Sequence, residues 1–481
     1  MDSTNIDEMC DALDVELKKR GLSRRDALKL AGLGTASFML NPTIATAATK
    51  AEASNAKAKI VIAGGGAAGC SVASYLAKNL SSPDITIIEP NPKGVSYQPG
   101  QTLIASGVWT LDDILADNKD FYPSEAKWIQ DSITEFDPDN NKVKTAKSGD
   151  VTYDFLVVAT GLQLNYDAIE GLTKEMIGKD GIGSIYFAEG AVKTWPLMQE
   201  FVQKAKKGGK KVEGVFTHPA TPIKCGGAPK KIMYLTHARL EEAGARANAE
   251  LTFYPSGGSM FGVKEYHEAI VKQFESRNMK WKYKHNLVGV DAGKKIAIFD
   301  NHYLEKGKWD EDLGEFEMIP KIKKVEVPYD FLHVTPPMSA PKVVKDSPLS
   351  WKKGSAAAGG WVELEKETLH HTRYKNVFAL GDVAGIPMGK TGGSVRKQYG
   401  VLCQNLIAMM EGKQMSAKYD GYTVCPLITG LNTVALLEFN WTNRPAPSFP
   451  LDPSQERWIW WLLKVYALKP MYFYGMLKGR A

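Results

Sequence analysis

Two cysteines of this chain lie in sequence contexts where a thiol can react. Cys225 lies in a Gly- and Pro-rich stretch at residues 221–229, and Cys425 lies in a second loop-like stretch at residues 419–430. Two thiols that meet can exchange an electron pair with a redox partner by opening and closing a disulfide. They can equally form an inert, stabilising disulfide, and sequence alone does not prove that they meet.

The elements that would position these thiols begin with a dinucleotide-binding signature. Residues 59–69 have the pattern of a strand that runs into a helix, with glycines in G-x-G-x-x-G spacing at Gly64, Gly66 and Gly69. These glycines permit a tight turn, close approach of a pyrophosphate and close helix packing. A second strand follows and ends at Glu89, where an acid is expected to bind an adenosine ribose. The N-terminal portion of the chain is therefore predicted to bind a dinucleotide.

Two later segments make FAD the expected dinucleotide. One apolar strand ends at Thr160 and Gly161, and another ends at Asp382. Both resemble the later FAD-binding strands of flavoprotein reductases with two dinucleotide-type domains. A second glycine fingerprint for NAD(P)H is missing from residues 211–227, where prolines and Cys225 replace the phosphate-binding turn.

The two ends of the chain predict a location. Residues 23–29 contain paired arginines before a short apolar run, which resembles the bacterial Tat export signal. This predicts a signal peptide at residues 1–47 and a protein on the periplasmic side of the inner membrane. Residues 454–480 carry rows of Trp and Tyr punctuated by lysines, and Pro470 is expected to divide them into two segments, each too short to span a bilayer. We expect an amphipathic element lying in the membrane interface; a core or dimer helix is the alternative.

Composition limits the function classes. The chain has 481 residues, 44% of them hydrophobic, and a net charge of +6. Its one tight basic cluster, at residues 206–211, has no interleaved aromatics, so no nucleic-acid site is predicted. No metal site is predicted either. The expected division is a signal peptide (1–47), the first segment of an FAD-binding domain (58–165), a second Rossmann-like domain (166–330), the second segment of the FAD-binding domain (331–415) and a C-terminal region (416–481).

The stretch from residue 216 to 439 is similar to the sulfide:quinone oxidoreductases, and most to their mitochondrial-type branch. The similarity is carried by the motifs at residues 224–235, 332–339, 359–369 and 418–427. The resemblance implies an α/β fold of two interleaved Rossmann-like domains with a C-terminal membrane-facing element. It also implies an enzyme that binds FAD, oxidises hydrogen sulfide and reduces a membrane quinone.

The resemblance assigns roles to residues. Cys225 and Cys425 would form a redox disulfide that hydrosulfide attacks, with the persulfide first on Cys425 and Cys225 facing the flavin. Lys224 is expected to lower the pKa of Cys225, and Gly226 and Gly227 to let the backbone approach the ring. Lys390 would lie at the pyrimidine edge of the flavin, and Phe439 and Trp441 are nominated for the quinone channel. No cysteine in residues 94–107 could tether the flavin, so FAD is expected to bind non-covalently.

Three other functions remain open on sequence. They are the flavoprotein subunit of a flavocytochrome c sulfide dehydrogenase, a type-2 NADH:quinone oxidoreductase and a non-catalytic flavin-binding protein. The sequence identifies neither the sulfur acceptor nor the quinone, and a homo-oligomer is possible.

Overall fold

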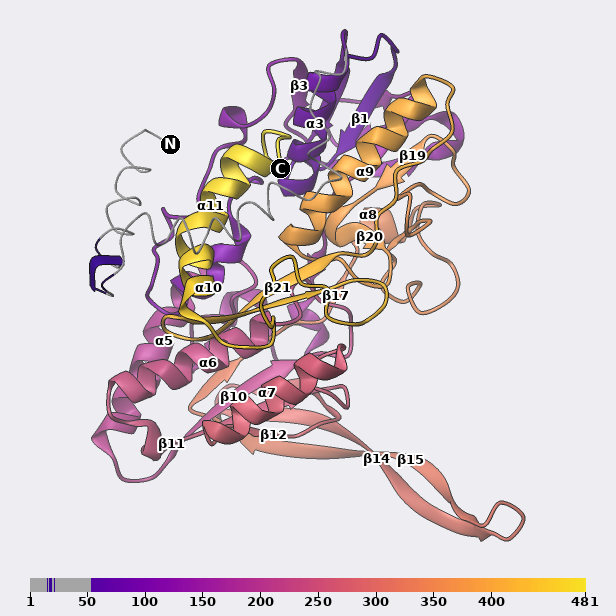
Figure 1. Ribbon diagram of the computed structural model, residues 1–481. Coiled ribbons are helices and arrows are strands. Elements are labelled where there is room, and N and C mark those ends of the chain that lie inside the picture. Colours follow the sequence, from indigo (N-terminus) through magenta and orange to yellow (C-terminus); the bar gives the residue numbers. More distant parts are fainter. Residues whose placement is uncertain (1–14, 16, 20, 22–52) are drawn as a thin grey trace.

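A computed structural model describes residues 15, 17–19, 21 and 53–481 of the chain. Two parallel five-stranded sheets, one above the other in Figure 1, carry the two Rossmann-like domains, and helices pack on their faces. The predicted α/β architecture is confirmed.

The first sheet is built from segments far apart in the sequence. Its order is β19-β7-β1-β2-β3, and every pairing is parallel. Strands β1, β7 and β19 are mostly apolar and buried, as parallel strands covered on both faces must be, whereas the edge strand β3 is only partly buried. Their bounds are β1 (Lys59–Ala63), β2 (Asp84–Ile88), β3 (Ala126–Ile129), β7 (Phe155–Val158) and β19 (Val377–Ala379). Helices α3 (Ala67–Asn79) and α9 (Gly392–Met410) pack against each other beside this sheet.

The second sheet has the order β12-β11-β10-β16-β9, again with parallel pairings. Its strands are β9 (Ile182–Gly183), β10 (Val212–His218), β11 (Ala249–Pro255), β12 (Lys280–Trp281) and β16 (Phe331–His333), and its helices are α5 (Ala188–Lys207), α6 (Ala228–Glu242) and α7 (Lys264–Ser276). Because β16 pairs with β10, residues 331–333 belong to this sheet, although the sequence places the domain boundary just before them.

A long hairpin projects from the second domain. The sheet β13-β14-β15 comprises β13 (His285–Asp291), β14 (Ile296–Asp310) and β15 (Glu315–Pro328), and its outer half extends from the body as an arm (Figure 1). The arm exposes apolar side chains, among them Trp309, Leu313 and Ile322.

The C-terminal region begins with an antiparallel ribbon, β21 (Thr423–Gly430) and β22 (Thr433–Phe439). A continuous helical run follows: α10 (Trp458–Leu462), a π-helical segment (Leu463–Ala467), α11 (Leu468–Pro470) and a second π-helical segment (Met471–Met476). Pro470 therefore does not divide this region, because it sits at the junction where the hydrogen-bonding pattern widens.

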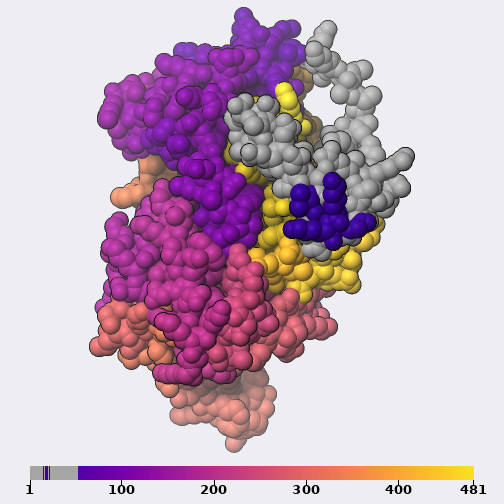
Figure 2. All heavy atoms as spheres, turned by 90° about the vertical axis from the view of Figure 1, so that its left-hand side faces the viewer, coloured from indigo at the N-terminus to yellow at the C-terminus, as the bar shows by residue number. Residues whose placement is uncertain are grey.

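The C-terminal run is packed against the rest of the protein along much of its length. Trp460 and Trp461 are buried in a cluster that also contains Leu17, so this residue of the expected signal peptide contacts the body. Figure 2 shows the yellow C-terminal atoms beside both domains. Among the described residues, no helix has the length and apolar character needed to cross a membrane.

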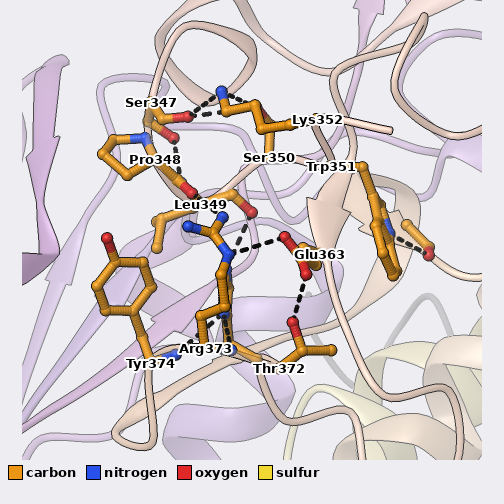
Figure 3. A network of polar contacts seen from close by, with 12 residues as sticks. Ser347, Pro348, Leu349, Ser350, Trp351, Lys352, Glu363, Thr372, Arg373 and Tyr374 are labelled. Carbon is orange, nitrogen blue, oxygen red and sulfur yellow. Dashed lines mark hydrogen bonds and ion pairs between the residues drawn. The ribbon is translucent and has the colours of Figure 1, made fainter. Parts of the chain in front are cut away.

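A network of hydrogen bonds around Arg373 and Glu363 holds the chain ahead of β19 in place (Figure 3). Arg373 donates from Nε to Glu363 at 3.0 Å and also bonds the carbonyl of Pro348. Lys352 donates to the Ser347 carbonyl at 2.8 Å. These contacts position the strand that leads to Asp382.

The remaining short elements are α4 (Gln101–Ile104), β4 (Ile133–Asp137), β5 (Lys142–Thr145), β6 (Asp150–Thr152), β8 (Gln163–Leu164), β17 (Met338–Ser339), α8 (Lys342–Lys345), β18 (Val362–Glu363) and β20 (Ala384–Gly385).

Candidate functional site

One cavity of about 410 Å³ runs from the carboxyl edge of the first sheet to the second domain and the C-terminal region. Its volume is in the range of cofactor sites. The cavity brings together most residues that the sequence singled out. Those on its wall are Gly66, Glu89, Thr160, Gly161, Lys224, Cys225, Asp382 and Lys390.

The glycine turn has the geometry that a dinucleotide requires. Gly64 has a φ of +101°, and a Cβ there would lie 2.4 Å from the carbonyl oxygen of Ala159. A Cβ on Gly69 would lie 1.9 Å from the carbonyl oxygen of Gly64, so helix α3 can approach the strand only because this residue is glycine. Gly66 is the N-cap of α3, where free N–H groups face the cavity and can bind phosphate.

The cavity wall also offers polar groups for the remainder of FAD. Glu89 Oε2 accepts a hydrogen bond from the Gly65 N–H at 2.9 Å, and burial raises the pKa of this carboxyl group. The buried Thr160 hydroxyl has no partner within the described residues of the chain. The residues present therefore fit FAD: Glu89 would bind the adenosine ribose, and the turn and Thr160 the pyrophosphate.

A partly buried acid, Asp382, lies among lysines where the ribityl chain and flavin ring would bind. Burial raises the pKa of Asp382, and Lys224 and Lys390 oppose that shift. Lys390 donates to the carbonyl oxygens of Asp382 (2.6 Å) and Ala384 (2.9 Å). Burial lowers the pKa of Lys390 to about 7, so this lysine can gain or lose charge near neutral pH.

The two predicted cysteines meet, although 200 positions separate them in the sequence. Cys225 lies on the cavity wall at the start of α6, and its thiol is in hydrogen-bonding contact with that of Cys425. Both thiols are free in this structure. A Cβ on Gly227 would lie 2.3 Å from Cys425 Sγ; this glycine makes room for the second thiol rather than for the flavin ring.

The β21–β22 ribbon places the two thiols in different surroundings. Successive side chains of a strand face opposite sides. Val424 and Pro426 line the cavity, whereas Cys425, between them, is 3% exposed and is not on the cavity wall. Cys225 alone of the pair is on the wall, where it can contact a bound flavin.

The electrostatics favour a thiolate on Cys225. A hydrogen bond from the Cys425 thiol, with Lys231 and Lys464 nearby, holds the pKa of Cys225 well below its ordinary value, although burial opposes this. Lys231 Nζ is 3.6 Å from Cys225 Sγ. The pKa of Cys425 is raised by its contact with Cys225 and by burial. Cys225 also has a φ of +83°, a strained conformation for a residue with a side chain.

The sequence did not identify Lys231 as the partner of the Cys225 thiol. It assigned Lys224 to the thiol, but Lys224 Nζ bonds Gln98 Oε1 at 2.7 Å, and Lys231, one turn into α6, reaches the sulfur instead. The signal available in the sequence was the position of Lys231, six residues after Cys225. This spacing indicates a contact only when the path of the loop and the first residue of helix α6 are known. Lys464 was likewise seen only as a member of a membrane-facing segment; it is 2% exposed and donates to the Pro99 carbonyl at 2.9 Å.

The two residues nominated for the quinone do not reach the cavity. Phe439 packs against Phe261 and Tyr266. Trp441 packs against Tyr419 and donates from Nε1 to its carbonyl at 3.0 Å. Neither is on the cavity wall. Tyr422, just before β21, and Leu436 and Glu438, on β22, do line the cavity.

A dinucleotide turn, an interleaved second Rossmann-like domain and a cysteine pair at their junction define the class of dinucleotide-dependent disulfide oxidoreductases. Residues 58–190 match the family model described as "Pyridine nucleotide-disulphide oxidoreductase". The chain is 38% identical to a protein of Mus musculus named "Sulfide:quinone oxidoreductase, mitochondrial", with 88% of this chain and 86% of the relative covered. It is 40% identical to the protein of that name from Dictyostelium discoideum, with the same coverage.

A crystal structure of the sulfide:quinone oxidoreductase of Aquifex aeolicus shares the fold, with a TM-score of 0.67 at 22% identity, covering 88% of this chain and 92% of the other. The chain therefore belongs to the sulfide:quinone oxidoreductase family. Its cofactor is FAD, as the sequence predicted.

The predicted location is wrong. The mouse and Dictyostelium relatives are named as mitochondrial proteins, which contradicts export to a bacterial periplasm. The paired arginines on which the export prediction rested lie outside the described residues. An arginine pair before a short apolar run is a weak signal because many N-terminal segments share it.

Proposed function

We propose that this chain oxidises hydrogen sulfide through Cys225 and Cys425 and passes two electrons by way of FAD to a quinone. The observation that carries the proposal is the contact of the two thiols at the wall of the FAD cavity, with Lys231 Nζ 3.6 Å from Cys225 Sγ. An inert disulfide needs neither a flavin beside it nor a buried lysine at one sulfur. The relatives' names support the same substrate and acceptor.

The two cysteines account for each bond that forms and breaks in the sulfur step. In the disulfide form, hydrosulfide attacks Cys425 Sγ, the bond between Cys425 and Cys225 breaks, and Cys225 leaves as a thiolate. Cys425 then carries a persulfide, whose outer sulfur passes to an acceptor. Lys231 stabilises the leaving thiolate by its charge, and the contact of Cys225 with the cavity directs that thiolate to the flavin. FAD, when bound, takes up two electrons and gives them to the quinone.

Association with a membrane surface belongs to the same proposal. A quinone with a lipid tail must enter from a bilayer, and the C-terminal run contributes Leu463, Leu468 and Met471 to the cavity wall. The aromatic and lysine content of this run supports an interfacial position.

The test is an anaerobic absorbance titration of the purified protein with sulfide, followed by addition of a soluble quinone. We expect sulfide to bleach the flavin, a transient long-wavelength thiolate-to-flavin band, and recovery on adding quinone. Cys425→Ser should abolish bleaching by sulfide. Cys403→Ala is the matched control, because Cys403 is buried in α9 away from the cavity wall. Bleaching at the wild-type rate in Cys425→Ser would refute the role of the pair, and bleaching by NADH instead of sulfide would refute the substrate.

A further inference from the structure

A buried acid on the cavity wall has no role in the site described so far. Three carboxyl groups line the cavity among the described residues of the chain: Glu89, Asp382 and Glu438. The first two lie where the adenosine and the ribityl chain would bind. Glu438, on β22, is 1% exposed and remains unassigned.

Glu438 is the centre of a compact hydrogen-bonded group. Its Oε1 accepts from the Tyr422 hydroxyl at 2.5 Å and from the Ser448 hydroxyl at 2.7 Å. Its Oε2 accepts from the Ser448 N–H at 3.0 Å. Tyr422 also lines the cavity, whereas Ser448 is half-buried and does not belong to the cavity wall. The group therefore extends from the cavity wall to a residue that is partly exposed.

The surroundings on the cavity side are apolar. Val424, Pro426 and Leu436 extend from the same face of the ribbon, and Leu463 comes from the C-terminal run. Such a wall suits an apolar ring, and the phenol–carboxyl pair beside it can hydrogen-bond an oxygen on that ring.

We propose that Glu438 and Tyr422 deliver a proton to the quinone as it is reduced. This inference rests on the proposed function, which supplies the quinone and the electrons. Reduction of a quinone to a quinol takes up two electrons and two protons. The electrons come from sulfide, and one proton accompanies them.

The second proton reaches the quinone through Tyr422 and Glu438. The Tyr422 O–H bond breaks while a new O–H bond forms on a quinone oxygen, and Tyr422 regains a proton from Glu438, which takes it up from solvent on the Ser448 side. Tyr422 donates to Glu438 Oε1 in this structure, so their hydrogen bond reverses when Glu438 takes up the proton. Positioned general acids contribute on the order of 10²–10⁴-fold to such a step.

Other titratable groups face this pair and set the background for its pH dependence. Tyr266 on α7 donates to the backbone carbonyl of Glu438 at 2.6 Å. Arg396 and Lys397 on α9 lie close enough to influence the phenol and the carboxyl group, respectively. Lys464 is on the same cavity wall. Because solvent supplies the proton, its delivery should weaken as pH rises.

The experiment follows the two half-reactions separately by anaerobic stopped-flow spectroscopy. In Glu438→Gln, sulfide should bleach the flavin at the wild-type rate, whereas reoxidation by a soluble ubiquinone analogue should slow roughly 100-fold. Tyr422→Phe should slow only reoxidation, by a smaller factor. Glu438→Asp keeps an acid and should restore much of the rate. Glu275→Gln, an exposed glutamate on α7, serves as the control that keeps the acid on the wall.

A structural role alone would not reproduce two further readouts. The wild-type reoxidation rate should fall with rising pH, and this dependence should vanish in Glu438→Gln. Infrared difference spectra recorded during quinone reduction should show a protonated-carboxyl band that Glu438→Gln removes. Wild-type reoxidation in Glu438→Gln, or an unchanged pH profile, would overturn the proposal. If Glu438→Gln fails to fold, the same profiles of Tyr422→Phe decide it. A wild-type protein that sulfide does not bleach would instead refute the proposed function.

Discussion

Replacing Lys231 by methionine should raise the pKa of Cys225 and remove much of its thiolate at neutral pH. Lys231 is 4% exposed, so methionine keeps the buried apolar volume and removes only the charge. The ammonium nitrogen lies 3.6 Å from the sulfur. At this distance and an effective dielectric constant of about 20, the attraction is about 4.6 kcal/mol.

That energy corresponds to about three pKa units, at about 1.36 kcal/mol per unit. It is an upper value, since Lys464 and the Cys425 thiol still stabilise the Cys225 thiolate in the variant. We expect an increase of roughly one to three units, and a slower sulfide half-reaction because Cys225 becomes a poorer leaving group.

The assay measures the thiolate-to-flavin absorbance band of the dithiol protein as a function of pH, with site-specific alkylation of Cys225 followed by mass spectrometry as a second readout. Lys230→Met is the matched control. Lys230 is equally buried, but its Nζ bonds the Gly226 carbonyl at 3.3 Å and lies over the Phe253 ring rather than at the Cys225 sulfur. A midpoint in Lys231→Met within roughly half a unit of wild type would refute the electrostatic reasoning.

Three further results follow from the geometry. Gly69→Ala should destabilise the protein by about 1–3 kcal/mol and lower its FAD content, because the new Cβ would meet the Gly64 carbonyl; thermal unfolding and bound flavin measure this, with Gly400→Ala, where space is open, as the unaffected control. Burial lowers the pKa of Lys464 from 10.5 to about 7, so between these values the unfolded chain binds more protons than the native one, and native stability should rise with pH. The free energy of unfolding of the apoprotein, measured by denaturation at pH 7 and pH 9, should therefore rise more in the wild type than in Lys464→Met, by at most about 1.4 kcal/mol per pH unit. An equal change in both proteins would contradict the lowered pKa of Lys464. Trp441→Phe should leave the quinone KM unchanged, because Trp441 does not line the cavity. A severalfold increase in this KM would instead support a role for Trp441 in quinone binding.

Much of the fold was predictable because its signals are local. The strand, glycine turn, helix and acid at residues 59–89 follow one another along the chain, and each has a steric or electrostatic reason to be there. The loss of the second nucleotide fingerprint was equally visible, since prolines remove N–H donors. The path of the C-terminal run was not, because whether Pro470 interrupts a helix depends on the packing and hydrogen bonding around it.

The sequence alone determined the chemical groups: a dinucleotide turn, two cysteines in reactive contexts and an aromatic, lysine-rich C-terminus. Only the tertiary structure decided which groups meet. In the tertiary structure Cys225 contacts Cys425, and Lys231 rather than Lys224 lies beside the Cys225 sulfur. Glu438 and Tyr422 line the cavity, whereas Phe439 and Trp441 do not. The reason is geometric. The alternation of β21 and β22 and the start of α6 set the direction of each side chain, and these directions are fixed only when segments hundreds of residues apart pack together.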